Sequence, residues 1–222
     1  MSVLEADIPP ADGMSDAVAG VRVVTSANGM AHIRQPDCAA VVWQREPLTS
    51  FQAWINALDP SHLPRTRIVL RPAAVRDAVI HACDQAQMPE SPQRTILADD
   101  ISALAAAFAD LTQAAFVRLR LDVVNTDACR KFHVDAISSR LICTYRGTGT
   151  QYGVARDGEQ PDRVFTAPVG APLVLRGKLW PAKQPSRLLH RSPPIAGTGE
   201  TRLVLVVDPL DDATEDVDYV MH

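Results

Sequence analysis

The sequence contains few cysteines, and none of them are paired. Its four cysteines, Cys38, Cys83, Cys129 and Cys143, stand far apart and form no Cys-x-x-Cys motif. Closely paired cysteines are typical of zinc fingers and of disulfide-rich secreted domains. Both classes are therefore disfavoured, and most of the cysteines are expected to be reduced thiols that pack as small buried hydrophobic residues.

The sequence also lacks a cluster of basic residues. It has 22 Lys and Arg residues against 26 Asp and Glu residues, for a formal net charge of -4. Proteins that bind nucleic acid neutralise phosphates with clustered positive charge. A nucleic-acid partner is therefore not expected.

No apolar run approaches the roughly 20 residues that span a bilayer. The first residues, 1–7, lack the order of a signal peptide, in which positive charge precedes an apolar segment. We therefore expect no membrane partner and a cytoplasmic location. Aromatic residues make up 5% of the chain, and Trp43, Trp54 and Trp180 are expected to be packing residues.

The length and hydrophobic content predict one main domain. The chain has 222 residues, of which 46% are hydrophobic, enough for one sizeable core. Residues 1–20 carry prolines and scattered acids without apolar periodicity, which predicts a disordered leader. Residues 211–222 are acidic and predict a solvated tail. The single domain is thus expected over residues 21–210.

The first part of this domain, residues 21–115, has mixed patterns. Two strands and three helices are expected there: strands at 21–24 and 40–43, and helices at 49–58, at 75–86 and from Asp99 or Asp100 to Thr112. In the last helix, apolar residues recur on one face from Ile101 to Leu111. The helices are expected to pack against a sheet.

The second part, residues 116–210, is rich in short β segments. Six strands are expected: 116–124, 140–145, 163–166, 172–176, 186–190 and 201–207. Glycines such as Gly147, Gly170 and Gly177 mark the reversals between them. This pattern is typical of an antiparallel sandwich or barrel, and the whole domain is therefore predicted to be α+β.

Three residues in this β-rich part are candidate metal ligands. Side chains alternate faces along a strand, so His133 and Asp135 point the same way and can bind one ion together. His190 comes close to them if the sheet returns the chain. Two histidines and one carboxylate on one side of a metal form the facial triad of non-heme Fe(II) oxygenases, which leaves coordination positions open.

The sequence resembles a bacterial family defined as a domain of unknown function, DUF1826. The resemblance rests on Cys129–Asp135, on Leu141–Gly147, and on Leu189–Pro194 followed by Gly197–Leu203. It covers roughly residues 35–210. It brings no established activity with it.

More distantly, the order of His-x-Asp, a later His and then Arg resembles the 2-oxoglutarate-dependent oxygenases. This resemblance implies a double-stranded β-helix, a cupin-like jelly roll, with packing helices contributed mainly by the N-terminal half. It implies that His133, Asp135 and His190 bind Fe(II) and carry catalysis. It also implies that Arg202 holds the far carboxylate of 2-oxoglutarate through its two parallel donors, and Tyr145 can add a hydroxyl donor.

Other interpretations of these residues stay open. Arg202 can instead be an ordinary strand arginine paired with Glu200 or Asp208. Cys129, four residues before His133, can approach the same metal and would make the site more suited to zinc. The remaining histidines, His32, His62, His81 and His222, have no ligand spacing around them and are expected to be surface or core residues.

Three functions are therefore compared. The favoured one is an Fe(II)/2-oxoglutarate-dependent oxygenase acting on an unidentified small-molecule or protein substrate. The first alternative is a cupin-like protein that binds zinc or another divalent metal, with a role in metal homeostasis and no oxygenase activity. The second alternative is a metal-free interaction module.

Overall fold

The computed structural model describes residues 20–127, 129–156, 159–182 and 186–213. The predicted leader, apart from Gly20, and most of the predicted acidic tail lie outside these residues. Among the described residues, no helix combines the length and the apolar character needed to cross a membrane.

The helices all precede residue 113 in the described part of the chain. They are η1 (Ala27–Arg34), α1 (Thr49–Ala57), η2 (Pro60–His62), η3 (Pro72–Ala74), α2 (Val75–Gln85) and α3 (Pro92–Thr112), of which the η elements are 3-10 helices. The strands are β1 (Val21–Val24), β2 (Ala40–Trp43), β3 (Thr66–Leu70), β4 (Phe116–Val124), β5 (Ser139–Arg146), β6 (Gln151–Val154), β7 (Phe165–Thr166), β8 (Leu173–Arg176), β9 (Leu188–Arg191) and β10 (Arg202–Leu210).

Most predicted elements are present. One start is misplaced, and two strands and the three 3-10 helices were not predicted. The helix expected to begin at Asp99 or Asp100 begins at Pro92, because Ser91 caps it by accepting a hydrogen bond from the Arg94 backbone N–H (3.2 Å). Strands β3 and β6 were not predicted from the sequence. Their apolar residues are too few or too exposed for clear alternation, and both strands form by pairing with neighbours far along the chain.

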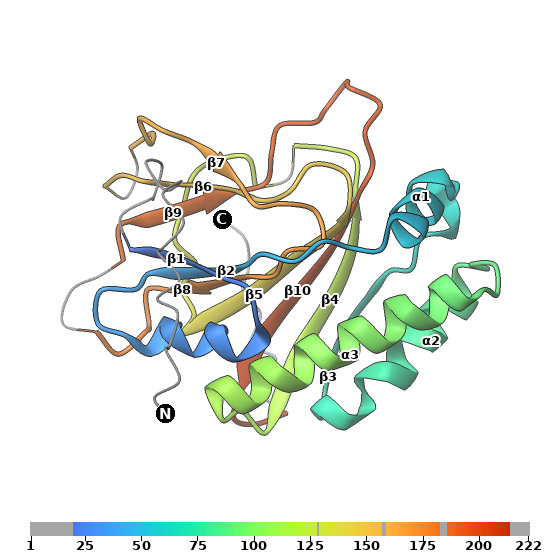
Figure 1. Ribbon diagram of the computed structural model, residues 1–222, viewed down its shortest axis with the longest axis horizontal. Coiled ribbons are helices and arrows are strands. Elements are labelled where there is room, and N and C mark those ends of the chain that lie inside the picture. Colours follow the sequence, from blue (N-terminus) through green and yellow to red (C-terminus); the bar gives the residue numbers. More distant parts are fainter. Residues whose placement is uncertain (1–19, 128, 157–158, 183–185, 214–222) are drawn as a thin grey trace, which may run out of the picture.

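The strands form two sheets of unequal size. The large sheet has the order β1-β2-β8-β5-β10-β4-β3, and the small one has the order β7-β6-β9. Strands β1, β2 and β3 of the first half thus extend the sheet built by the second half. The helices α1, α2 and α3 cover one side of the large sheet, and the small sheet lies over its other side (Figure 1).

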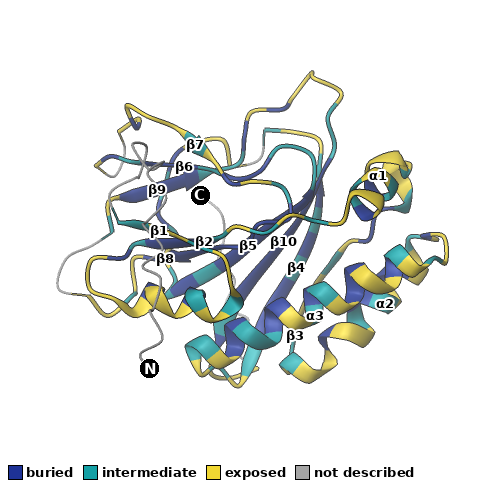
Figure 2. Ribbon diagram, viewed as in Figure 1, coloured by how far each residue is buried: buried dark blue, intermediate teal, exposed yellow. Residues whose placement is uncertain are grey.

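Each face of the large sheet has its own apolar core. On the helical side, Leu97, Ile101 and Phe108 of α3 pack with alternate residues of the central strands, such as Leu119 and Leu205. A second cluster between the two sheets contains Ile142, Tyr152, Leu173, Val204 and Val206. The central strands are consequently buried along their length (Figure 2). The large sheet is mixed, because β1 and β2 are parallel while the other pairs are antiparallel.

A partly buried ionic cluster joins α3 to the helical side of the sheet. The Asp100 carboxylate accepts two hydrogen bonds of 2.6 Å from Arg45 and a third, also 2.6 Å, from the Tyr145 hydroxyl. Its neighbour Asp99 forms an ion pair with Arg76. The Asp99 side chain is 56% exposed and the Arg76 side chain is 48% exposed. Adjacent helical residues of the same type therefore occupy very different environments.

We expect Asp100→Ala to lower the free energy of unfolding by about 2–4 kcal/mol, because it leaves the Arg45 guanidinium and the Tyr145 hydroxyl without their acceptor. Asp99→Ala is the matched control, with an expected loss below about 1 kcal/mol, since an exposed ion pair contributes little. Urea unfolding of both variants measures the difference. Equal losses would contradict the structural role of the cluster.

Candidate metal centre

The two candidate histidines face each other across an isolated antiparallel bridge between β9 and the segment that precedes β5. The His133 backbone N–H donates to the His190 carbonyl (3.1 Å), and the His190 N–H donates back to the His133 carbonyl (3.0 Å). Residues that exchange both bonds in an antiparallel bridge carry their side chains on the same side. The imidazole ring centroids accordingly lie 4.6 Å apart.

The Asp135 carboxylate completes the group. Its Oδ1 lies 3.4 Å from Nε2 of His133, and its Oδ2 lies 3.1 Å from Nε2 of His190. One potential ligand atom from each of the three residues lies within 4.8 Å of the other two. The structure therefore brings together the three side chains that the sequence pattern assigns to a metal, although 55 residues separate Asp135 from His190.

The donor atoms suit a divalent metal ion. Nδ1 of His133 lies 2.8 Å from the Lys131 carbonyl oxygen. A carbonyl can only accept, so Nδ1 carries a proton, and once Nε2 gives up its own proton to Asp135 or to solvent its lone pair becomes available to a metal. Two ligands each about 2.1 Å from a metal and at right angles lie about 3 Å apart, close to the separations found here. A cation between these facing acceptors would remove their mutual repulsion.

Arg140 holds the Asp135 carboxylate in place from β5. Its Nη1 lies 2.7 Å from Asp135 Oδ2. Its Nε and Nη2 donate to the two carboxylate oxygens of Asp208 on β10, at 2.6 and 2.8 Å. Because Asp208 is 2% exposed and fixes the guanidinium plane, Arg140 presents its remaining edge to Asp135 in a defined orientation.

The backbone around Asp135 is held by the turn after β8. Lys178 N–H donates to the Asp135 carbonyl (2.8 Å), and Gly177 N–H donates to the Ser138 carbonyl (2.8 Å). A Cβ at Gly177 would stand 2.0 Å from the Ile137 carbonyl oxygen and 2.9 Å from that of Asp135. Only glycine lets the turn approach the 135–138 segment this closely.

The environment keeps the carboxylate ionised. Burial opposes the charge, but the hydrogen bonds from His133 and His190, with the charge of Arg140, hold the pKa of Asp135 well below its usual range. The hydrogen bond with Asp135 raises the pKa of His133, whereas burial lowers the pKa of His190. An ionised carboxylate and a buried imidazole that favours its neutral form are what metal ligation requires.

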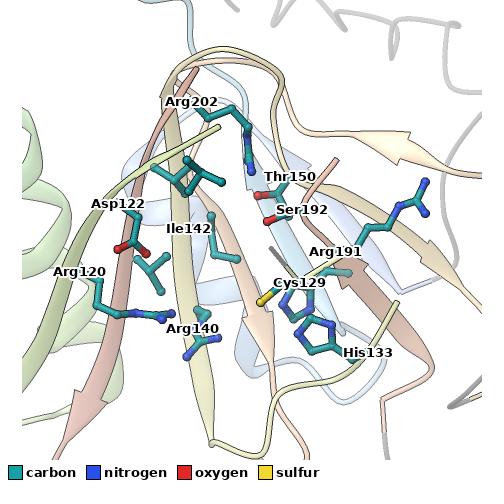
Figure 3. A pocket seen from close by; sticks show the side chains of 14 residues that line it. Arg120, Asp122, Cys129, His133, Arg140, Ile142, Thr150, Arg191, Ser192 and Arg202 are labelled. Carbon is teal, nitrogen blue, oxygen red and sulfur yellow. The ribbon is translucent and has the colours of Figure 1, made fainter. Parts of the chain in front are cut away.

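The group opens into a pocket between the two sheets. The cavity has a volume of about 120 Å³, and its lining includes His133 and His190 as well as Arg120, Asp122 and Arg202. Arg120 and Asp122 come from β4, and Arg202 comes from the start of β10 and points into the pocket from the opposite end to His133 (Figure 3). Charged side chains of both signs thus surround the candidate metal centre.

Arg202 is buried, with an exposure of 1%. Its Nε donates to the Thr148 carbonyl (2.6 Å), and its Nη2 lies 3.4 Å from the Thr144 hydroxyl. Neither of the partners considered from the sequence takes it, because Glu200 accepts from Thr148 and Asp208 accepts from Arg140. Burial lowers the pKa of Arg202 to about 10, so the guanidinium is still charged at neutral pH.

No described carboxylate forms an ion pair with Arg202. A buried cation with one edge held by a carbonyl and the other facing a pocket is suited to bind an anion.

The structure places Tyr145 away from this pocket. Its side chain lies on the opposite face of β5, in the core beneath the helices, where its hydroxyl donates to Asp100. Side chains alternate along the strand, so Ile142 and Thr144 face the pocket side while Cys143 and Tyr145 face α3. Tyr145 therefore cannot donate its hydroxyl to a cosubstrate in the pocket, contrary to the sequence-based expectation, and belongs instead to the ionic cluster of Arg45 and Asp100.

Cys129 lines the same pocket, in a backbone conformation with φ of 54°. The described group of ligand atoms within 4.8 Å of one another contains the two histidines and Asp135 without this thiol. The geometry therefore assigns Cys129 to the pocket wall.

Sequence reasoning missed Arg120, Asp122 and Arg140. A signal for the first two was present in β4, where Arg118, Arg120 and Asp122 alternate with apolar residues. Charges at every second position of a buried strand indicate a polar cavity on that face. The contact of Arg140 with Asp135 had no such signal, because it depends on how the segment before β5 turns.

Residues 25–208 match the family described as protein of unknown function (DUF1826). No curated protein matches the chain.

The chain is also similar to several solved structures. AtDAO1, the dioxygenase for auxin oxidation 1 from Arabidopsis thaliana in a complex with 2-oxoglutarate, is 11% identical, with 87% of this chain and 92% of that chain covered and a TM-score of 0.52. An oxidoreductase of the 2OG-Fe(II) oxygenase family from Burkholderia pseudomallei is 18% identical, with 85% and 92% covered and a TM-score of 0.46. The dioxygenase for auxin oxidation from rice is 13% identical, with 86% and 83% covered and a TM-score of 0.47.

Proposed function

We propose that this chain, which belongs to the DUF1826 family, is a non-heme Fe(II)/2-oxoglutarate-dependent oxygenase. The observation that carries the proposal is the convergence of His133, Asp135 and His190 at a pocket that also contains the buried guanidinium of Arg202, which forms no ion pair with a described carboxylate. The triad supplies a site for Fe(II), and Arg202 supplies a site for a carboxylate. The fold likeness to a dioxygenase in complex with 2-oxoglutarate supports the same assignment.

The order of the strands supports a double-stranded β-helix. From β4 onward the chain alternates between the sheets: β4, β5, β8 and β10 are adjacent in the large sheet, while β6, β7 and β9 form the small one. The isolated bridge of His133 adds the segment between β4 and β5 to the edge of β9. Two facing sheets connected in this manner form a jelly roll, whose interior holds the ligands.

Each pocket residue then has a distinct task. The two imidazoles and the carboxylate would hold the metal, and Arg140 keeps the carboxylate oriented. Arg202 would bind the far carboxylate of 2-oxoglutarate with the donors that face the pocket. The apolar side chains of Ile142, Val204 and Val206 line the cavity and limit the access of water.

The bound metal and cosubstrate would supply the oxidation. When Fe(II) is held there, 2-oxoglutarate and oxygen are converted to succinate and carbon dioxide, while one oxygen atom is transferred to the substrate.

The proposal is tested by adding Fe(II) and then 2-oxoglutarate to the protein under anaerobic conditions. A visible charge-transfer band is expected in the wild type, because 2-oxoglutarate would chelate the Fe(II) that the protein holds. His133→Ala should lose the band, and the exposed His32→Ala is the control that should retain it. Absorbance titration and circular dichroism of both variants make the measurement and confirm that they fold.

Two outcomes would overturn the proposal that the protein is an oxygenase. Wild-type protein that binds zinc tightly and gives no band with Fe(II) and 2-oxoglutarate would indicate a zinc-binding protein. Protein purified without a polyhistidine tag that binds no divalent metal at all would indicate a metal-free interaction module.

A further inference from the structure

Strand β4 presents a pair of opposite charges to the pocket. Its apolar residues Val117, Leu119 and Leu121 pack in the helical core, so Arg120 and Asp122 point to the other side. In the register of the sheet, Arg120 stands beside Val206 of β10 and Asp122 stands beside Val204, and both valines also line the cavity. The two charged side chains are therefore neighbours on one wall of the pocket (Figure 3).

Among the described residues, Arg120 forms no hydrogen bond or ion pair, although the charges of Asp208 and Asp122 act on it. Its Nε is buried without a hydrogen-bond acceptor. The nearby cation Arg140 is already bound to Asp208 and Asp135. Burial, reinforced by repulsion from Arg140, lowers the pKa of Arg120. An anion beside Arg120 would satisfy its donors and relieve this repulsion.

Asp122 is likewise available. It is half-buried at the pocket wall, and within the described ranges it forms no ion pair or hydrogen bond with another side chain. Its carboxylate forms no ion pair with Arg120, so the oxygens of Asp122 lie more than 4 Å from the guanidinium nitrogens of Arg120. Within the described part of the chain, the pocket wall thus offers a cation and an anion at neighbouring positions of one face, and neither is engaged in an ion pair.

We infer that the substrate is a small free zwitterion of the amino-acid type, whose carboxylate binds Arg120 and whose ammonium group binds Asp122. A dianion such as a phosphate ester would be repelled by Asp122, and a simple amine would leave Arg120 unpaired. A residue inside a peptide has neither charge on its backbone, and a cavity of about 120 Å³ suits a small molecule. As a statement about the oxidised substrate, the inference rests on the proposed oxygenase function.

Binding is measured separately from turnover. The probes are the standard L-amino acids, titrated one at a time by calorimetry into protein loaded with Mn(II) and 2-oxoglutarate. At least one is expected to bind. Its N-acetyl derivative, which lacks the ammonium charge, and its amide, which lacks the carboxylate, should each bind at least about 10-fold more weakly, because each loses one charge-assisted contact.

The matching variants remove the same charges from the protein. Arg120→Met and Asp122→Asn should each weaken binding of the amino acid at least about 10-fold. Arg22→Met is the control, since Arg22 is exposed on β1, pairs with Asp37 and does not line the pocket. It should bind the amino acid like the wild type.

The results separate this inference from the proposed function. A wild type that forms the Fe(II)/2-oxoglutarate band but binds none of the amino acids overturns the inference and leaves the oxygenase standing. Amino acid binding that is unchanged in Arg120→Met and Asp122→Asn also overturns it. If the band is absent, the titrations are repeated on protein without metal, and binding that depends on Arg120 and Asp122 then supports the zwitterion site while the oxygenase falls.

Discussion

Metal affinity is expected to fall at least about 100-fold when His190 is replaced by Ala. Loss of an outer partner of a metal ligand typically costs 10–100-fold in affinity, and loss of the ligand itself costs more. His190 is 6% exposed, and its Nε2 lies 3.1 Å from Asp135 Oδ2. The remaining pair, His133 and Asp135, would then have to hold the ion alone. Calorimetric titration with Mn(II), an oxygen-stable substitute for Fe(II), measures the change.

The control for this experiment is His32→Ala. His32 is exposed in η1, away from the pocket lining, and its replacement should leave the Mn(II) affinity unchanged. If His190→Ala does not fold, His133→Ala serves in its place, because the His133 side chain is 36% exposed and its loss leaves a smaller cavity. Wild-type affinity for Mn(II) in a folded His190→Ala protein would refute the metal centre.

Binding of 2-oxoglutarate should weaken by roughly 30-fold to 4,000-fold in Arg202→Met. Removing one partner of a buried, hydrogen-bonded charge pair costs about 2–5 kcal/mol, and each 1.4 kcal/mol corresponds to about tenfold in affinity. Methionine fills much of the same space without the charge. The affinity of Arg202→Lys for 2-oxoglutarate should lie between those of the wild type and Arg202→Met, since lysine keeps the charge and loses the parallel donors. Anaerobic titration of the Fe(II)-loaded protein with 2-oxoglutarate, followed by the visible band, makes the measurement.

Arg191→Met provides a matched control for this prediction. Arg191 lines the same pocket, but its Nε donates to Gln151 (2.8 Å) and its guanidinium lies 4.4 Å from the centre of the Phe132 ring. Its side chain extends away from the cavity (Figure 3). Metal affinity should be unchanged in both variants. An Arg202→Met protein that titrates like the wild type would show that another group holds the cosubstrate.

Much of the β-rich half was predictable because its signal is local. The strand from 116 to 124 alternates apolar and charged residues, and the structure forms β4 over those residues. The relation of His133 to Asp135 is also local, since a separation of two residues in extended chain keeps both side chains on one side. The start of α3 was misjudged for a related reason: the apolar periodicity is clear only from Ile101, whereas Ser91 and Pro92 set the true beginning.

The contacts between distant segments needed the tertiary structure. The side of β5 on which Tyr145 lies depends on its pairing with β10, where the register shifts between Leu203 and Val204. Likewise, the bond of Arg140 to Asp208 joins residues 68 positions apart. Neither is encoded in a short window of sequence, because a shift of one residue in the pairing would exchange the faces of the whole strand.

The amino-acid sequence by itself determined which residue types are available as metal ligands, the positions of most strands and the shared direction of the His133 and Asp135 side chains. These follow from backbone propensity and from the alternation of side chains, which act within a few residues. Only the tertiary structure decided that His190 lies opposite His133, that Arg202 has no acidic partner among the described residues, and that Arg120 and Asp122 face the same cavity. Those relations arise when two sheets pack and their registers are set by the burial of apolar faces.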